Sequence, residues 1–228
     1  MKQAQSSTRS PQRKRTSPKR TGGGPNAKPA RRTGASAPRT PKPRRRAKSE
    51  PTFGARRWWW WAVGTLALLF FCGLALPEEP LIPVKNAAAK DWNRTSFWHE
   101  PWGPSGVHKG VDIFAPQGTP VLAPTGGVVV YRGQFSLGGN VLLVLGPKWR
   151  LHYFAHLNRS YVGIGTPVAR GREMAEVGNT GNAAGKPPHL HYAIISLLPL
   201  PWRWDGATQG WKKMFYLNPH EWLLRQPD

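Results

Sequence analysis

The chain has few residues of two kinds that mark common protein classes, cysteines and acids. Its 228 residues include one cysteine and 11 aspartates and glutamates, against 33 lysines and arginines. One cysteine cannot form an intramolecular disulfide, so a disulfide-stapled secreted mini-domain and a cysteine-rich zinc finger are both excluded. The shortage of acids gives a formal net charge of +22, which by itself suggests a nucleic-acid-binding protein.

The positive charge is concentrated in a segment that lacks the apolar residues needed to fold. Residues 1–57 hold 18 basic residues and one acid, Glu50, whereas the rest of the chain holds 15 basic and 10 acidic residues. We predict that residues 1–55 are a disordered basic cytoplasmic tail, because their composition buries too little apolar area to offset the entropy of ordering. Such a tail either sets membrane topology as a solvated segment or contacts polyanions non-specifically, whether nucleic acid or anionic lipid.

An uncharged apolar run follows the tail. Arg56 and Arg57 precede 19 uncharged residues, Trp58 to Leu76, which as a helix span about 28 Å, close to the hydrocarbon thickness of a bilayer. We predict a transmembrane helix over residues 56–77, with a cytoplasmic N-terminus by the positive-inside rule and the remainder of the chain across the membrane. A cleaved signal peptide is the alternative, but the 57 residues before the run are too many for one.

Beyond the apolar run, the sequence becomes first a linker and then a series of short β-branched runs. Residues 78–100 resemble a linker, with Asp91 to Glu100 as an alternative start of the folded part. Residues 101–198 carry Val-, Leu- and Ile-rich runs between Gly- and Pro-containing turns, a pattern that predicts a mainly β domain with an antiparallel sheet. Residues 199–228 are a Trp-rich C-terminal extension, in which Asn218 and Pro219 predict the start of one short helix.

Two pairs of residues in the β region have the spacing of metal ligands. His108 and Asp112 are four residues apart and His189 and His191 are two apart, so the members of each pair share a face if the segment is extended. Asp112 is also the only carboxylate between residues 101 and 172. Two imidazoles and one carboxylate suit a zinc ion, with the fourth position left to water in a catalytic site. The spacing leaves open which of His189 and His191 binds the metal.

The remaining histidines must supply any general base, because the chain has no HExxH motif and few acids. His156 lies in a strand-like run, where we expect it to share a face with His152 and Phe154. An imidazole with a pKa near 6.5 suits proton transfer at neutral pH. Taken singly, His99, His152 and His220 are expected to be ordinary hydrogen-bonded histidines.

Four phrases, in this order, carry a resemblance to a known family. The segment from about Gly103 to Tyr192 resembles the lysostaphin-type zinc metallopeptidases, which show HxGxD, GTPVxAxxxGxV, YxHL and GxTGxxxxxHLH. The corresponding phrases here are His108-Lys109-Gly110-Val111-Asp112, Gly118-Thr119-Pro120-Val121, Phe154-Ala155-His156-Leu157, and Gly178-Asn179-Thr180-Gly181 followed by His189-Leu190-His191. Leu217-Asn218-Pro219 is similar to the closing phrase of the family.

The resemblance implies both a metal site and a substrate. It makes His108, Asp112 and His191 the ligands of one zinc ion, and His156 and His189 the general base and transition-state stabilisers beside it. It also implies a metalloendopeptidase that uses a zinc-activated water to hydrolyse the peptides of bacterial peptidoglycan. With the predicted helix, this places a single-pass protein in the bacterial inner membrane, with a periplasmic or extracellular catalytic domain.

The sequence departs from the family pattern at positions expected to contact substrate. Phe154 stands where Tyr is usual, and Trp98 and Trp102 occupy a stretch where relatives often offer Arg or Tyr. All five site positions are kept, so we favour an active enzyme. The alternatives are a non-catalytic peptidoglycan-binding module or activator of cell-wall amidases, and a membrane-tethered nucleic-acid binder that acts through its tail.

Three tryptophans of the C-terminal extension allow two interpretations. Trp202, Trp204 and Trp211 follow the last predicted strand of the β region. They either line a groove for peptide or glycan or, as is commoner for such residues, cap the β core.

Overall fold

The computed structural model describes residues 53–225. The predictions made for the tail at residues 1–52 lie outside the described residues, as do residues 226–228. The first described element is helix α1 (Phe53–Ala75), which begins three residues before the stretch 56–77 expected to be a transmembrane helix and ends two residues before its end. Residues 53–55, expected to belong to the disordered tail, are therefore helical. The segment Arg57–Ala75 of this helix is long and apolar enough to cross a membrane, and none of it is buried against the rest of the protein.

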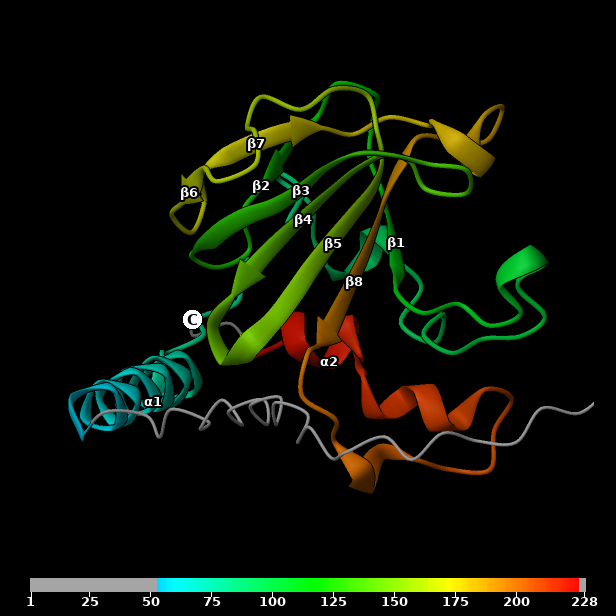
Figure 1. Cartoon of the computed structure of the whole chain (residues 1–228). Coiled ribbons are helices and arrows are strands. Elements are labelled where there is room, and N and C mark those ends of the chain that lie inside the picture. The colour runs from blue at the N-terminus through cyan, green and yellow to red at the C-terminus, as the bar shows by residue number, and fades with distance from the viewer. Residues whose placement is uncertain (1–52, 226–228) are drawn as a thin grey trace, which may run out of the picture. The chain divides into compact units, whose positions relative to one another are not determined.

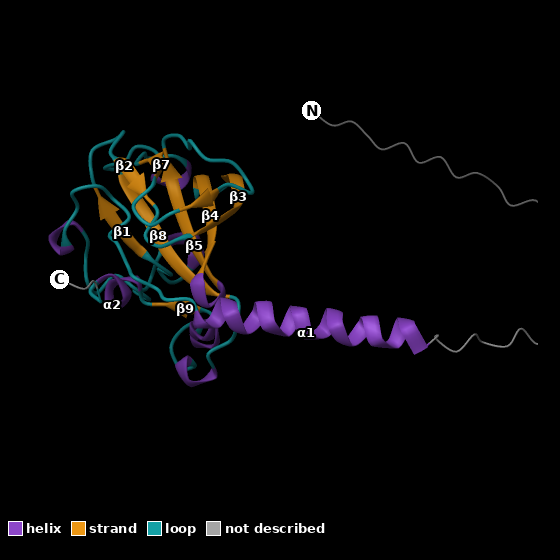
Figure 2. Cartoon of the chain, turned by 90° about the vertical axis from the view of Figure 1, so that its left-hand side faces the viewer, coloured by secondary structure: helices purple, strands orange, loops and turns teal. Residues whose placement is uncertain are grey.

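The remaining elements are short strands and a few helical turns (Figures 1 and 2). The strands are β1 (Val111–Phe114), β2 (Pro120–Leu122), β3 (Gly127–Phe135), β4 (Gly139–Gly146), β5 (Arg150–Leu157), β6 (Pro167–Val168), β7 (Glu173–Glu176), β8 (His189–Ser196) and β9 (Tyr216–Leu217). The helical turns are η1 (Ala89–Asp91), η2 (Gly103–Ser105), η3 (Pro147–Trp149), η4 (Gly181–Ala183), η5 (Pro201–Arg203), η6 (Gly210–Met214) and the α-helix α2 (Pro219–Leu223).

Seven of the strands form one sheet in which every pairing is antiparallel. The order is β1-β8-β5-β4-β3-β6, with β9 added to β8, while β2 and β7 form a separate antiparallel pair. Short connections such as residues 136–138 let consecutive strands pair as hairpins, and Gly139, at the start of β4, has a φ of 62°, a conformation that favours glycine. The predicted mainly antiparallel β fold is therefore confirmed.

The hydrophobic core lies on one face of the large sheet. Phe154, Tyr192, Leu142 and Ile194 are all fully buried there. His152 is buried in the same layer, with Nδ1 2.7 Å from the hydroxyl of Tyr192. The expectation that His152 is an ordinary hydrogen-bonded histidine is confirmed, and the opposite face of the sheet is left free to carry a site.

Part of the segment expected to be a linker belongs to this core. Within residues 78–100, Val84 forms a β-bridge to Val121, and Trp92 is 5% exposed. The Trp92 indole N–H donates to Nδ1 of His220 at 3.1 Å, which gives His220 the structural role expected of it. The composition of this segment concealed its packing because its few large apolar residues are widely spaced.

The helix predicted near the C-terminus is present as α2. Asn218 precedes it, and its side-chain oxygen accepts a hydrogen bond from the backbone N–H of His220 at 3.1 Å. Pro219 occupies the first helical position, where the missing N–H costs nothing. Trp222 and Leu223 then point into the core. The cap and proline signals alone located this element.

Candidate metal centre

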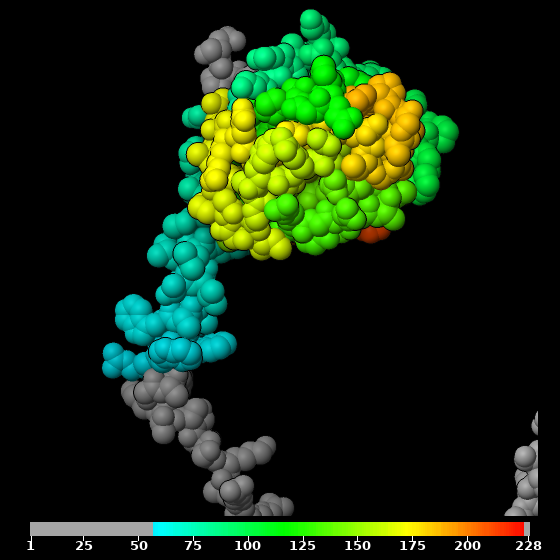
Figure 3. All heavy atoms as spheres, turned by 90° about the horizontal axis from the view of Figure 1, so that it is seen from above, coloured from blue at the N-terminus to red at the C-terminus, as the bar shows by residue number. Residues whose placement is uncertain are grey.

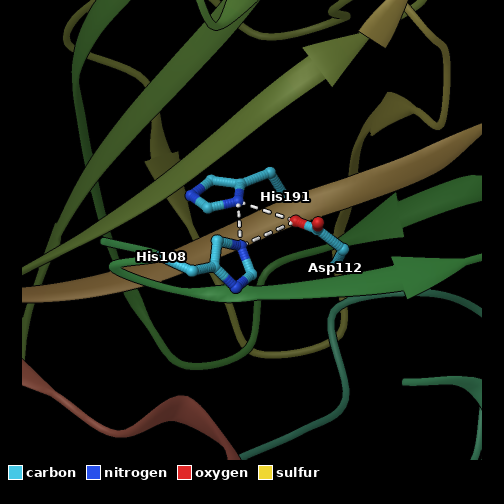
Figure 4. Close-up of side chains that lie close together, drawn as sticks. All are labelled: His108, Asp112 and His191. Carbon is cyan, nitrogen blue, oxygen red and sulfur yellow. Dashed lines mark hydrogen bonds and ion pairs between the residues drawn. The ribbon is translucent and has the colours of Figure 1, made fainter. Parts of the chain in front are cut away.

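Three side chains meet on the open face of the large sheet (Figure 4). Nε2 of His108 lies 3.1 Å from Oδ1 of Asp112 and 3.1 Å from Nδ1 of His191, and the last two atoms are 2.8 Å apart. Asp112 is on β1, His191 is on β8, and His108 is in the loop before β1. The register of the β1–β8 pair places Asp112 directly opposite His191, which brings together ligands that are far apart in sequence.

Hydrogen bonds fix which atom of His108 faces this cluster. Its Nδ1 lies 3.0 Å from the backbone oxygen of Ser96. A carbonyl oxygen can only accept, so Nδ1 carries the proton and Nε2 presents a lone pair to the other two side chains. An outer hydrogen bond of this kind is the usual way to hold a metal-binding imidazole in one tautomer.

The third side chain is an ionised carboxylate. Burial opposes ionisation of Asp112, but hydrogen bonds and charge interactions with His108 and His191, in the state where these imidazoles are protonated, outweigh it and hold the pKa of Asp112 well below its usual range. At neutral pH the cluster therefore offers imidazole lone pairs and a carboxylate charge to a cation. A divalent cation with bonds of about 2.0–2.1 Å at tetrahedral angles would set its ligand atoms roughly 3.3 Å apart, close to the distances observed. The donor set fits zinc.

Gly110 allows the two ligand-bearing strands to approach. A Cβ atom at this position would lie 2.5 Å from the backbone oxygen of Tyr192 and 2.9 Å from the ring of His191. Such contacts are too short, so any larger residue would push the start of β1 away from β8. The glycine of the HxGxD motif is thus needed for close packing next to the metal ligands.

Two further histidines lie next to the cluster. The ring of His156 is centred 4.9 Å from that of His189 and 6.0 Å from that of His191. Nδ1 of His156 lies 2.9 Å from the backbone oxygen of Thr180, and Nδ1 of His189 lies 2.9 Å from that of Pro187. Each Nδ1 therefore donates its proton to a carbonyl, which leaves both Nε2 atoms as free acceptors. Burial, followed by the neighbouring His191, lowers the pKa of His156 to about 4.

The expected orientation of His156 is wrong. His152 and Phe154 lie on the core face, whereas His156 lines the open face together with Ala155. The cause is a bulge: the β4–β5 register shifts between Asn140 and Leu142, and His156 has a φ of 63°. An extra residue in the strand breaks the alternation of faces and redirects the side chain, which strict period-two reasoning cannot anticipate.

A cavity of about 950 Å³ opens over these five residues. Figure 3 views the molecule from above, onto one end of the sheet. The loop that contains η4 (gold) lies there beside green segments. The backbone N–H of Asn182 donates to the oxygen of Leu137, which ties this loop to the β3–β4 hairpin. The lining includes aromatic residues that no sequence phrase identified, namely Phe114, Phe135, Tyr153 and Tyr216.

One tryptophan and two lysines shape the entrance to the cavity. The ring of Trp102 stacks on that of His108 at 4.1 Å, with 23° between their planes. Trp98, the other tryptophan at which the sequence departs from the family pattern, is directed elsewhere: its indole N–H donates to the backbone oxygen of Thr208 at 2.9 Å. Lys109 and Lys186 also line the cavity, where Asp112 is the one carboxylate among the described residues. The cavity thus offers positive charge to an anionic ligand.

The tryptophans of the C-terminal extension do not cap the core, but one of them, Trp211, lines a separate pocket of about 400 Å³ together with Leu197 and Tyr216. Trp202, Trp204 and Trp211 are 78%, 64% and 50% exposed, so they do not cap the core. They are also absent from the lining of the large cavity. The core position next to His152 is filled instead by Trp222, whose ring centre lies 5.3 Å from that of the histidine.

Comparison with known proteins identifies the domain that holds the cavity. Residues 106–198 match the model of Peptidase family M23. The chain is 39% identical over 113 residues to the L-Ala–D-Glu endopeptidase of Bacillus subtilis, covering 46% of this chain and 35% of that protein. It is 33% identical over 97 residues to the peptidoglycan DD-endopeptidase ShyC of Vibrio cholerae, covering 42% of this chain and 22% of that protein.

A similar solved structure is the catalytic domain of the antimicrobial peptidase lysostaphin from Staphylococcus simulans. Its TM-score is 0.48 at 24% sequence identity, covering 61% of this chain and 99% of that one. The two curated relatives are longer proteins, of which this chain spans about a third or less. On the family match and these relatives, residues 106–198 are similar to Peptidase family M23, the lysostaphin-type metallopeptidases.

Proposed function

We propose that the chain is a membrane-anchored zinc endopeptidase that hydrolyses peptide bonds of bacterial peptidoglycan. The observation that carries the proposal is the meeting of His108, Asp112 and His191 within 4.8 Å of one another in an open cavity. Two more histidines with free Nε2 atoms lie beside them. The names of the two relatives, an L-Ala–D-Glu endopeptidase and a peptidoglycan DD-endopeptidase, support wall peptide as the substrate.

In this proposal, the ligand set would hold one zinc ion through Nε2 of His108, Oδ1 of Asp112 and Nδ1 of His191. Bound zinc would supply Lewis acidity, lowering the pKa of a coordinated water and polarising the scissile carbonyl. Nε2 of His156 or of His189 would take a proton from the attacking water and return it to the departing amine. The pKa of about 4 for His156 keeps it neutral, and so able to accept, at neutral pH.

The cavity has the shape and charge for an extended acidic peptide. The exposed edges of Trp102 and Phe114 offer apolar walls, and Lys109 and Lys186 offer positive charge to the free carboxylates of wall peptides. Whether the bond cut resembles that of the Bacillus or of the Vibrio relative is decided by mass analysis of fragments from defined wall peptides.

The anchor is the second part of the proposal. Helix α1 would cross the cytoplasmic membrane once, with Arg57 and the tail on the cytoplasmic side and the peptidase domain outside. This arrangement would place the cavity in the compartment that contains peptidoglycan. Contact of the tail with nucleic acid or anionic lipid stays a prediction, since the tail lies outside the described residues.

The test uses the full chain in detergent, with zinc content measured by mass spectrometry and hydrolysis measured on purified sacculi. His108→Ala should lose zinc and activity together, whereas His156→Ala should lose activity and keep zinc. His99→Ala is the matched control, because His99 is exposed and its side chain makes no hydrogen bond within residues 53–225. If His108→Ala and His156→Ala release the same fragments as the wild type, catalysis by this site is refuted. If the wild type binds sacculi without cutting them, the chain is a binding module or activator.

A further inference from the structure

The segment after β8 carries an exposed aromatic surface for which the proposed peptidase has no use. Its members, here called the tryptophan face, are Leu197, Trp202, Trp204 and Trp211, which are 49% to 78% exposed. Backbone contacts hold the segment together, since the N–H of Leu200 donates to the oxygen of Met214 at 2.8 Å. Exposed apolar clusters of this size mark an interaction surface.

Basic residues accompany these tryptophans. Residues 197–216 contain Arg203, Lys212 and Lys213 against one acid, Asp205, which pairs with Lys213. The ammonium group of Lys212 lies 5.5 Å from the centre of the Trp211 ring. Indole rings with lysine and arginine among them suit the headgroup layer of a bilayer, where the ring is half in hydrocarbon and the cations meet lipid phosphates.

The connection between α1 and the peptidase domain is too short for the domain to move far from the membrane. Helix α1 ends at Ala75, and Glu78 already forms an ion pair with Arg150 at the start of β5. The backbone N–H of Leu81 then donates to the oxygen of Pro124 at 2.9 Å. The domain already contacts the last turns of the helix, since the Trp149 indole N–H donates to the backbone oxygen of Phe70 at 3.0 Å. Beyond the helix only Leu76 and Pro77 precede Glu78, and two residues reach about 7 Å at most.

The tryptophan face begins at the same end of the sheet as this attachment. Arg150 is paired with Ser196 across β5 and β8, and the N–H of Leu197 donates to the oxygen of Trp149 at 2.9 Å. In Figure 1 the orange segment that follows β8 lies beyond this end of the strand. The face is therefore next to the point where the chain would leave the bilayer.

From these observations we propose that the tryptophan face docks on the anionic phospholipid bilayer in which α1 is anchored. The inference rests on the anchoring part of the proposed function. Docking fixes the orientation of the domain as well as its distance from the membrane. Ala155 and His191 pair five residues along the strands from Arg150 and Ser196, roughly 17 Å at the strand rise. His191 and the other metal-site residues thus lie away from the lipid, although the cavity lining also reaches Ile195 and Tyr216 near the docked end.

The experiment places an environment-sensitive fluorophore on the full chain in nanodiscs made of phosphatidylcholine and phosphatidylglycerol. The background is Cys72→Ser, because Cys72 is the one native cysteine. Trp202→Cys carries the probe on the tryptophan face, and Gln117→Cys carries it in an exposed turn after β1, at the cavity end of the sheet. We expect blue-shifted emission and quenching by headgroup nitroxide lipids at position 202, and neither effect at position 117.

Equal, weak quenching at positions 202 and 117 would overturn the proposal, as would a response at 202 to soluble glycan strands but not to lipid. The wild-type chain labelled at Cys72 is the control for anchoring, since this residue lies inside α1. Quenching at Cys72 by acyl-chain nitroxides without quenching at position 202 refutes docking and leaves the anchor intact. No quenching at Cys72 refutes the anchor itself, and with it the basis of this inference. Each labelled chain must keep the unfolding midpoint of the wild type.

Discussion

The four histidines around the cavity differ in whether the imidazole Nδ1 bonds a backbone carbonyl. His108, His156 and His189 all donate Nδ1–H to a carbonyl, so all three present Nε2 to the cavity. His191 is different, because its Nδ1 is the atom that faces Asp112. The contact with Asp112 distinguishes His191, in the ligand cluster, from His189, a distinction that sequence spacing alone could not make.

His156 tests the division between ligands and proton acceptors. We expect His156→Asn to lower kcat on wall peptides by about 10²–10⁴-fold, the usual contribution of general acid–base catalysis. Zinc content should be unchanged, because the His156 ring is centred 6.0 Å from that of His191 and belongs to none of the three ligand contacts. Asparagine is chosen because it tolerates the φ of 63° at this position. Loss of zinc in proportion to kcat would make His156 a ligand instead.

At the scale of elements, the site depends on how closely β1 lies against β8. The pairing of Asp112 with His191 puts two ligands on one face, and the loop before β1 returns His108 to them. The distances between the three ligand atoms therefore depend on how these segments pack together and not on the sequence of one strand. The close approach at Gly110 is what allows the loop and both strands to share one centre.

Gly110→Ala should therefore weaken zinc binding without removing a ligand. The added Cβ would lie 2.5 Å from the backbone oxygen of Tyr192, so β1 must shift. We expect a loss of about 10–100-fold in zinc affinity, the range found when groups that position ligands are changed. Competition with a chromophoric chelator measures it. Gly163→Ala is the matched control, since no atom lies within 4 Å of a Cβ there; equal affinities for the two variants would contradict the packing argument.

Local signals predicted the elements well, and non-local packing accounts for what they missed. The β-branched runs and turns gave the antiparallel sheet, and Asn218 with Pro219 gave α2. The family phrases then named His108, Asp112 and His191, the three side chains that meet in the cluster, but not the aromatic residues that line the cavity. The bulge at His156 was not predictable, because it depends on the register with β4. Trp92 lies in the stretch Asp91 to Glu100, which local signals left open between linker and folded domain, because its packing involves His220, 128 positions away.

For the molecule as a whole, the fold keeps one histidine neutral inside the core at a cost that depends on pH. His152 is buried behind the sheet between Tyr192 and Trp222, and its Nε2 has no hydrogen-bond partner among the described residues. Burial, with a contribution from the charge of Arg150, lowers the pKa of His152 to about 3. The unfolded chain would titrate this group at its ordinary value of 6.5.

Stability should consequently fall as the solution is acidified from about pH 6.5 toward pH 3. In that window the unfolded state binds a proton at His152 that the folded state excludes, so the free energy of unfolding decreases by roughly 1 kcal/mol per pH unit. His152→Gln removes the titrating group and keeps a side chain that can hydrogen-bond Tyr192. We expect this variant to be less stable than wild type at pH 7, with the difference shrinking toward pH 4.5, as measured by denaturant unfolding in detergent. His99→Gln, at an exposed position, should follow the wild type throughout. Parallel curves for His152→Gln and wild type across the window would show that protonation of this histidine does not govern the acid sensitivity of the fold.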